Sequence, residues 1–469
     1  AAGQCALYGN WGGCYNTAIG DGVMRSNTTG CHNAAIGKCA LDYNSTGCSN
    51  NAIGNSALSR NTTGCFNTAI GAGALQQNTT AGCNIAIGCG ALNVNTTGDN
   101  NTALGYLVLK ANTEGIYNTG IGLNALCNNT RGHFNTAIGA YTMNQNTDGD
   151  HNHSLGYYSL YANISGCHNT AIGCGALRNN TDGCYNAAIG ENALYSNTTG
   201  KHNHAIGCGA LRSNTTGDYN QAIGFNALYS NIHGGSNTAI GRHTLYSNIS
   251  AFYNTAIGSY ALRVNTEGED NTAIGYTALC SNTTADNNTA IGRNAMESNT
   301  TGHSNNAIGY QAMKSNTTGS RNNAIGCYVL CSNTTGYDNQ AVGYNTLKSN
   351  TIGCCNIGIG RDTLSQSVTG SFNTAIGYSA MYGNLYGDNN VAIGCQALTS
   401  NTRGSYNTAI GDNPLYYNTT GKHNAAIGWR ALYCNTTGGC NTAFGPSALY
   451  NNTTGHNNNA LGNEALCAN

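Results

Sequence analysis

The chain has 469 residues, of which 65 are Gly, only 2 are Pro and 8% are charged, and its formal net charge is −1. Scarce Glu, Lys and Gln argue against a helical solenoid, and low Pro with low net charge argues against disorder. The chain has no basic stripe for nucleic acid and no apolar run near the roughly 20 residues that span a membrane, so neither partner is expected.

A repeat of 17 residues runs through the whole chain. The Gly of an Ala-Ile-Gly triplet falls at Gly20, Gly37 and Gly54 and then every 17 residues to Gly462, without insertion or deletion. Counted from Asn16, the consensus is N-T-A-I-G-x-x-A-L-x-x-N-T-T-G-x-x. So short a period fits one coil of a parallel β-solenoid, with short strands and tight turns. The sequence therefore predicts an all-β fold in one domain, residues 1–469: a single parallel β-solenoid (β-roll) of about 28 coils.

The variation at each position of the repeat predicts which way it faces. Positions 4 and 9 take only apolar residues, so both are expected in the core, while positions 6, 7, 10, 11, 16 and 17 vary freely and are expected outside. Glycines at positions 5 and 15 predict corners with positive φ. Positions 2 and 4 should share one strand face, but position 2 is polar, so a bulge near position 3 is expected.

Two Asn columns are expected to form ladders. When coils stack about 4.8 Å apart, a recurring Asn can bond its amide to the copies above and below. Position 1 and position 12 carry these columns, which begin with Asn16, Asn33, Asn50, Asn67 and with Asn27, Asn44, Asn61, Asn78.

The unit Asn67-Thr68-Ala69-Ile70-Gly71 resembles the N-S-V-A-I-G repeats of YadA-like heads in trimeric autotransporter adhesins. The longer stretch from Tyr276 to Thr284 is also similar to repeats of phage and bacterial tail-fibre-like proteins. The resemblance implies a left-handed parallel β-roll that trimerises and binds host surfaces.

Cysteines recur in one column of the repeat. With 22 Cys in the chain and Cα atoms of adjacent coils about 4.8 Å apart, neighbours at position 16 fall within disulfide range. We expect disulfides and an oxidising compartment, with free surface thiols as the alternative. The candidates are Cys14, Cys31, Cys48, Cys65, Cys167 and Cys184.

The Asn-Thr-Thr corner matches the acceptor pattern for N-linked sugar, although it is also good turn chemistry and a laddered, inward Asn could not carry a glycan. Candidate acceptors are Asn27, Asn61, Asn197 and Asn316. At position 10, Tyr forms short surface columns that stiffen the stack or bind sugar rings. These are Tyr229 with Tyr246, and Tyr416 with Tyr433 and Tyr450.

No motif for catalysis, metal or cofactor stands out, so we expect neither an enzyme nor a cofactor. Neither end carries an evident polar cap, and uncapped coils invite pairing. We therefore expect self-association, as a trimer or a head-to-tail filament. The favoured function is a structural extracellular fibre, an adhesin or tail-fibre shaft, on a cell or virion surface. The alternatives are an ice-binding solenoid and a carbohydrate-binding rod that uses the Tyr columns.

Overall fold

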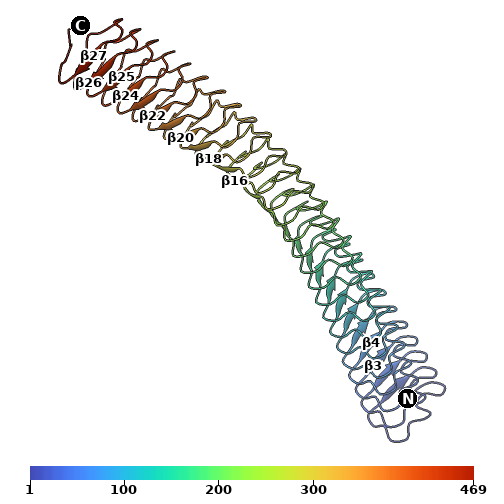
Figure 1. The fold of residues 1–469 in the computed structure, drawn as a ribbon. Coiled ribbons are helices and arrows are strands. Elements are labelled where there is room, and N and C mark those ends of the chain that lie inside the picture. The colour runs from blue at the N-terminus through green and yellow to red at the C-terminus, as the bar shows by residue number, and fades with distance from the viewer. Residues whose placement is uncertain (469) are drawn as a thin grey trace. The chain divides into compact units, whose positions relative to one another are not determined.

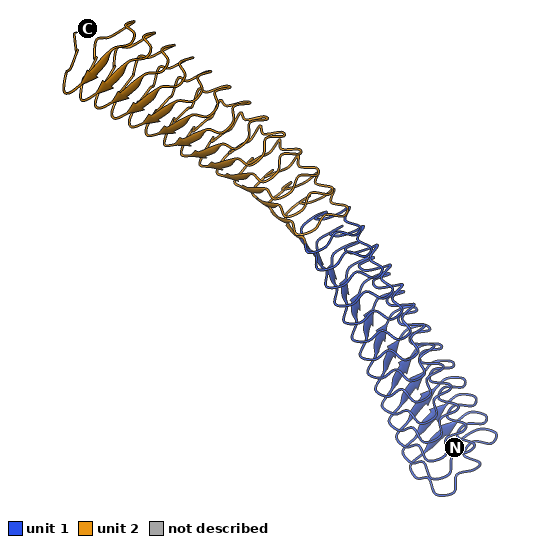
Figure 2. Ribbon diagram, viewed as in Figure 1, with its two compact units in different colours: residues 1–236 blue, residues 237–469 orange. Residues whose placement is uncertain are grey.

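The chain forms two stacks of β-coils, each with the 17-residue repeat as its coil. A computed structural model describes residues 1–468 and divides the chain into unit 1, Ala1–Ser236, and unit 2, Asn237–Asn469 (Figures 1 and 2). Every coil contributes one strand of three residues at positions 2–4, and the described residues form no helix. The predicted class, an all-β parallel β-solenoid, is confirmed.

Unit 1 holds strands β1 to β13, and unit 2 holds β14 to β27. In unit 1 they are β1 (Thr17–Ile19), β2 (Ala34–Ile36), β3 (Asn51–Ile53), β4 (Thr68–Ile70), β5 (Ile85–Ile87), β6 (Thr102–Leu104), β7 (Thr119–Ile121), β8 (Thr136–Ile138), β9 (His153–Leu155), β10 (Thr170–Ile172), β11 (Ala187–Ile189), β12 (His204–Ile206) and β13 (Gln221–Ile223). In unit 2 they are β14 (Thr238–Ile240), β15 (Thr255–Ile257), β16 (Thr272–Ile274), β17 (Thr289–Ile291), β18 (Asn306–Ile308), β19 (Asn323–Ile325), β20 (Gln340–Val342), β21 (Ile357–Ile359), β22 (Thr374–Ile376), β23 (Val391–Ile393), β24 (Thr408–Ile410), β25 (Ala425–Ile427), β26 (Thr442–Phe444) and β27 (Asn459–Leu461).

Within each unit, consecutive strands pair in parallel and in register. Ala18 lies opposite Ala35, and Ala35 lies opposite Ala52. Equivalent residues of adjacent coils therefore lie one strand spacing apart, which is about 4.8 Å. The pairing runs straight through position 3, so the bulge expected there does not form.

The core consists of positions 3, 8 and 9. In the second complete coil these are Ala35, Ala40 and Leu41, none of which is exposed to solvent. Position 4 was expected to point inward with position 9, and this prediction is wrong. Position 3 is buried in every strand, and positions 2 and 4 both face outward, as the alternation of a strand requires. Ile19 is thus 46% exposed, although Ile fills its column almost throughout.

The glycines at positions 5 and 15 are needed for different reasons. At position 5 the strand ends in a conformation with φ of 131° at Gly20, which confirms the predicted corner. At position 15 no positive φ occurs among the described residues, so that part of the prediction is wrong. There a Cβ on Gly47 would lie against the Oδ1 of Asn44 and the carbonyl of Gly64. Close approach of the next coil, rather than backbone twist, favours Gly at this position.

Candidate functional surfaces

The Asn column at position 1 forms a continuous ladder in each unit. The Oδ1 of Asn16 accepts the backbone N–H of Asn33 at 2.9 Å and its side-chain amide at 3.2 Å. Asn33 Nδ2 also donates to the carbonyl of Gly47 at 2.9 Å, which ties the two ends of one coil together. Asn50 repeats the pattern on Asn33. The Asn side chains of this column therefore supply the hydrogen-bond partners that buried backbone and amide groups cannot obtain from water. The role of the column is structural.

The Asn column at position 12 forms a second ladder. Asn44 Nδ2 donates to Asn27 Oδ1 at 2.7 Å and to the carbonyl of Gly47 at 2.9 Å. That carbonyl thus accepts amides from both ladders. The predicted ladders are confirmed.

The second ladder removes the candidate glycan acceptors from solvent. Asn27, Asn61, Asn197 and Asn316 are fully buried. In each of them Nδ2 already donates two hydrogen bonds, one to the Asn of the preceding coil and one to the Gly three residues on. A folded coil has no room for a glycan on these nitrogens, so these residues are corrected to ladder members.

The second ladder is interrupted at Ser367. The Ser367 hydroxyl and the Oδ1 of Asn350, which precedes it in the column, are both buried without a hydrogen-bond partner. The Nδ2 of Asn384, which follows, donates only to the carbonyl of Gly387 and lacks the bond to the preceding coil that other members of the ladder make. A buried polar atom without a partner costs about 1–3 kcal/mol, so this coil is a weak point of unit 2.

The cysteines at position 16 stack but do not form the predicted disulfides. All 22 cysteines are free thiols. Each Sγ in the first column takes the same orientation: Cys31 Sγ accepts the N–H of Cys14 at 3.1 Å, and Cys48 Sγ accepts that of Cys31 at 3.2 Å. Parallel side chains in register keep their sulfur atoms a whole coil apart, whereas a disulfide needs about 2.05 Å. The pairs Cys14–Cys31, Cys48–Cys65 and Cys167–Cys184 are therefore corrected to stacked thiols.

The Tyr column at position 10 is confirmed near the end of unit 2. Tyr416 and Tyr433 stack with ring centroids 5.2 Å apart, and Tyr433 and Tyr450 stack at the same distance. Tyr229 belongs to unit 1 and Tyr246 to unit 2, and their predicted pairing stays a prediction. From Tyr161 to Tyr229 in unit 1 the column alternates Tyr with Arg. There Arg212 lies over the Tyr229 ring and donates to its hydroxyl at 2.8 Å.

The longest aromatic stack lies at position 17, where only variable surface residues were expected. Seven rings of unit 1 stack face to face, with centroids 4.8–5.2 Å apart at every step. An unbroken run of aromatic residues and His at one position of the repeat was the signal that could have revealed it. The rings are Tyr117, Phe134, His151, His168, Tyr185, His202 and Tyr219.

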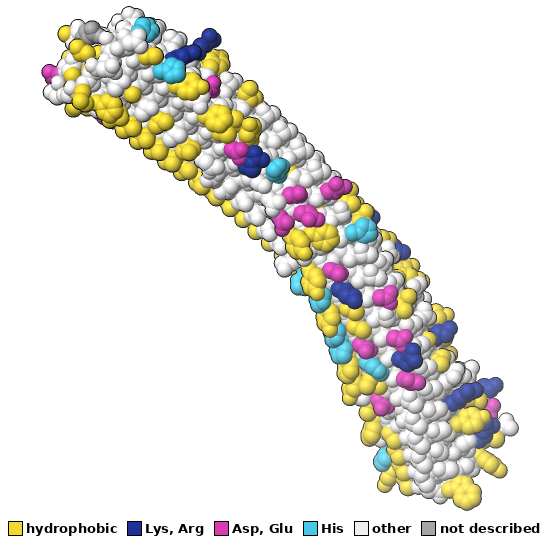
Figure 3. All heavy atoms as spheres, viewed as in Figure 1, with side chains coloured by type: hydrophobic (Ala, Val, Ile, Leu, Met, Phe, Trp, Pro, Cys, Tyr) yellow, Lys and Arg dark blue, Asp and Glu magenta, His cyan; other side chains and the backbone are white. Residues whose placement is uncertain are grey.

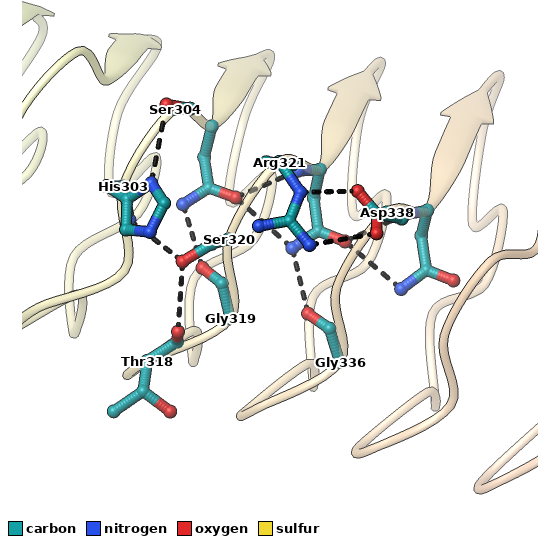
Figure 4. Close-up of polar contacts among 11 residues, drawn as sticks. His303, Ser304, Thr318, Gly319, Ser320, Arg321, Gly336 and Asp338 are labelled. Carbon is teal, nitrogen blue, oxygen red and sulfur yellow. Dashed lines mark hydrogen bonds and ion pairs between the residues drawn. The ribbon is translucent and has the colours of Figure 1, made fainter.

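Polar side chains at positions 16 and 17 also contact the next coil (Figure 4). Arg321 donates from Nε to Asp338 Oδ1 at 2.8 Å and from Nη2 to Oδ2 at 2.9 Å. This hydrogen-bonded guanidinium lowers the pKa of the Asp338 carboxyl. The Oγ of Ser320 accepts the N–H of His303 at 3.1 Å, as Cys Sγ does elsewhere in the column. Such exposed pairs contribute at most about 1 kcal/mol each.

The strands present an uncharged face in which an apolar column at position 4 lies beside a mostly polar column at position 2. Position 4 is exposed or half-buried in all 27 strands, and no Asp, Glu, Lys or Arg occurs at position 2, 3 or 4 of any strand. In unit 2, hydrophobic side chains gather along the side on which the ribbon draws β16 to β27 (Figures 1 and 3). We call this surface, formed by positions 2 and 4, the sheet face.

Residues 1–468 contain no group of three or more His, Cys, Asp or Glu side chains that could hold a metal ion. In the same residues no helix has the length and apolarity to cross a membrane. The hollows between side chains are shallow, such as the one lined by Cys65, Cys83 and Asp99 where Gly82 interrupts the thiol column.

The fold and these surfaces define the chain as a repeat protein of the parallel β-solenoid class. No protein-family model matches the chain, and comparison with curated proteins also finds no match.

Proposed function

We propose that the chain is a structural fibre element, an extracellular shaft of the adhesin or tail-fibre kind, that works by lateral self-association and carries out no catalysis. The sheet face is the observation that supports this. A repeat of tight coils offers a long regular surface rather than an enclosed cleft, and the most regular surface here is uncharged and carries a continuous apolar column at position 4.

The area of the sheet face is sufficient for an interface. Covering a side chain such as Ile19, which is 46% exposed, removes on the order of 50 Å² from water. The 13 strands of unit 1 would then bury about 650 Å² and the 14 of unit 2 about 700 Å², close to the roughly 800 Å² per partner of a stable interface. This area lies at or just above the upper end of the apolar patches that monomeric proteins expose, about 600 Å².

A second copy of the chain is the partner that the sheet face fits best. Its Ile side chains recur at one per coil, and another copy presents the same spacing without any charge that would need a counter-charge. The resemblance to trimeric adhesin heads favours three copies. The extracellular site of action rests on the same resemblance.

Analytical ultracentrifugation of the full chain tests this proposal. We expect the chain to sediment as an oligomer at micromolar concentration. A variant with Thr in place of Ile at β16 to β19 keeps β-branched residues in the strands but removes apolar area, so its dissociation constant should rise at least tenfold. The substitutions are Ile274→Thr, Ile291→Thr, Ile308→Thr and Ile325→Thr.

The matched control changes four exposed residues of the same coils, at the turn away from the sheet face. These are Thr284→Ala, Thr301→Ala, Thr318→Ala and Thr335→Ala, and they should leave association unchanged. A full chain that stays monomeric at tens of micromolar, or Thr and Ala variants that associate alike, would refute lateral association by the sheet face.

The two alternative functions receive less support from the geometry. Sugar rings bind to the faces of aromatic rings, but in the column of Tyr416, Tyr433 and Tyr450 the faces of the middle ring are covered by its neighbours. Ice binding needs a long Thr array, yet the longest Thr run at position 2 is the four strands β14 to β17. Thermal-hysteresis and glycan-array measurements on the full chain would test each of them.

A further inference from the structure

The four cysteines at position 16 of the first coils form a column of thiols with a single geometry. The thiols of Cys31, Cys48 and Cys65 each accept an N–H from the preceding coil, and all four thiols donate to the carbonyl two residues before them. The donor–acceptor distances are 3.6 Å for Cys14 and 3.4 Å for Cys31, Cys48 and Cys65. Side chains that share both contacts have the same conformation, so neighbouring sulfur atoms lie one coil spacing apart, about 4.8 Å.

We propose that adjacent thiols of this column bind soft monovalent metal ions of the Cu(I) type, each ion held linearly between two sulfur atoms. A metal–thiolate bond is about 2.3 Å long, so an ion midway between two sulfurs spans about 4.6 Å. That length matches the coil spacing without movement of the backbone. Thiolates are the ligands that Cu(I) prefers.

The same geometry disfavours the other fates of paired thiols. A disulfide would require the two sulfurs to approach from about 4.8 Å to about 2.05 Å, against the register of the coils. Zinc requires four ligands in a tetrahedron, and no group of three or more ligating side chains converges in residues 1–468. Two-coordinate ions are the class that a column of single thiols can satisfy.

Sulfur prefers a bent arrangement of its bonds, so one thiolate does not lie in line between two ions. The first column therefore holds one ion between Cys14 and Cys31 and another between Cys48 and Cys65. A third site lies in the same unit, where Cys184 Sγ accepts the N–H of Cys167 at 3.2 Å. Each ion displaces two thiol protons to solvent, and the complex of two thiolates with one monovalent ion carries one net negative charge.

Burial raises the pKa of the Cys167 thiol. A metal ion that coordinates a thiol removes its proton outright, however.

Anaerobic titration of the reduced full chain with Cu(I), against a chromophoric chelator that outcompetes single thiols, tests the proposal. We expect three ions per chain, with X-ray absorption showing two sulfur ligands per ion. The variant Cys31→Ser with Cys48→Ser leaves no adjacent pair in the first column and should lose two of the three ions. Serine is native at this position, and the Oγ of Ser320 accepts the same N–H bond, so the fold is preserved.

The matched control removes two exposed cysteines that have no thiol neighbour in their column, Cys89→Ser with Cys208→Ser, and should still bind three ions. Equal stoichiometry for the two double variants would overturn the proposal, as would three or four sulfur ligands per ion. A disulfide between Cys14 and Cys31 in the chain as isolated would also overturn the proposal. None of these outcomes depends on whether the chain self-associates.

Discussion

Backbone conformation, together with burial, determines which residues the coil accepts. Positions 7, 9 and 17 adopt left-handed conformations in coil after coil, with φ of 55°, 50° and 58° at Tyr158, Leu160 and His168. For residues other than Gly this conformation is uncommon, and it is worst for β-branched side chains. Position 9 is apolar and, from Met24 to Leu449, fully buried, yet it is Leu or Met in every coil and never Ile or Val. The left-handed backbone accounts for that restriction.

Replacing Leu160 by Ile should therefore destabilise its coil although the two side chains have equal volume. We expect a loss of about 2–3 kcal/mol, from a β-branched residue at positive φ and from repacking. Leu160→Met is the matched control, since Met143 occupies the same position one coil earlier, and it should cost less than about 1.5 kcal/mol. Native-state hydrogen exchange of amides in this coil measures both, because a long repeat does not unfold in one step. Equal losses for the two variants would show that backbone conformation does not select the residue.

The misassigned column at position 4 shows where reasoning from the sequence fails at this scale. A position that is always apolar is normally buried, and the composition of this column gave no sign that Ile36 faces outward while Ala35 faces the core. The strand alternation did hold that sign, because polar residues at position 2 require an outward position 4. A surface that another chain covers, as proposed for the sheet face, has the composition of a core, so composition alone cannot separate a buried column from such a surface.

At the scale of the element, the two Asn ladders stabilise each coil in the way that side-chain packing stabilises larger proteins. Each coil has a thin core of small residues, and its buried carbonyl at position 15 is satisfied by two Asn amides. Both ladders were predictable, because in-register stacking brings each invariant amide within hydrogen-bond reach of its copy in the next coil. The absence of disulfides was not predictable from the sequence. The Cα spacing of adjacent coils suits a disulfide, but the shared side-chain conformation holds the sulfur atoms apart.

Repairing the break in the second ladder should stabilise unit 2. With Ser367→Asn, the new amide can donate to Asn350 Oδ1 and to the carbonyl of Gly370, and its Oδ1 can accept from Asn384. We expect the local free energy of unfolding to rise by about 1–3 kcal/mol, measured as slower amide exchange in the two flanking coils.

The reverse change makes the matched control for this repair. Asn333→Ser creates the same defect two coils earlier, where the ladder is intact, and should weaken its coil by a similar amount. If Ser367→Asn leaves amide exchange unchanged, the hydrogen bonds between buried Asn side chains contribute little to the stability of the stack.

At the scale of the whole molecule, each unit is a one-dimensional array. A strand pairs with its neighbours along the chain, and contacts to the equivalent residue one coil away recur throughout the unit. In such an array stability is close to a sum of coil terms and nearest-neighbour terms. Coils should then be interchangeable, provided that register is kept.

Deletion of one complete coil, Asn271–Asn287, therefore tests the architecture more directly than any point change. The junction joins Asp270 to Asn288. The side-chain amide of Asn288, which donates to Asn271 Oδ1 in the full chain, would then donate to Asn254 Oδ1. We expect the shortened chain to keep its β-sheet circular dichroism, with amide exchange altered only in the coils that flank the junction. Deletion of residues 271–278 removes about half a coil and places every later residue opposite the wrong position, so it should unfold or aggregate. Equal tolerance of both deletions would mean that the stacked, in-register coil is not the unit on which this molecule is built.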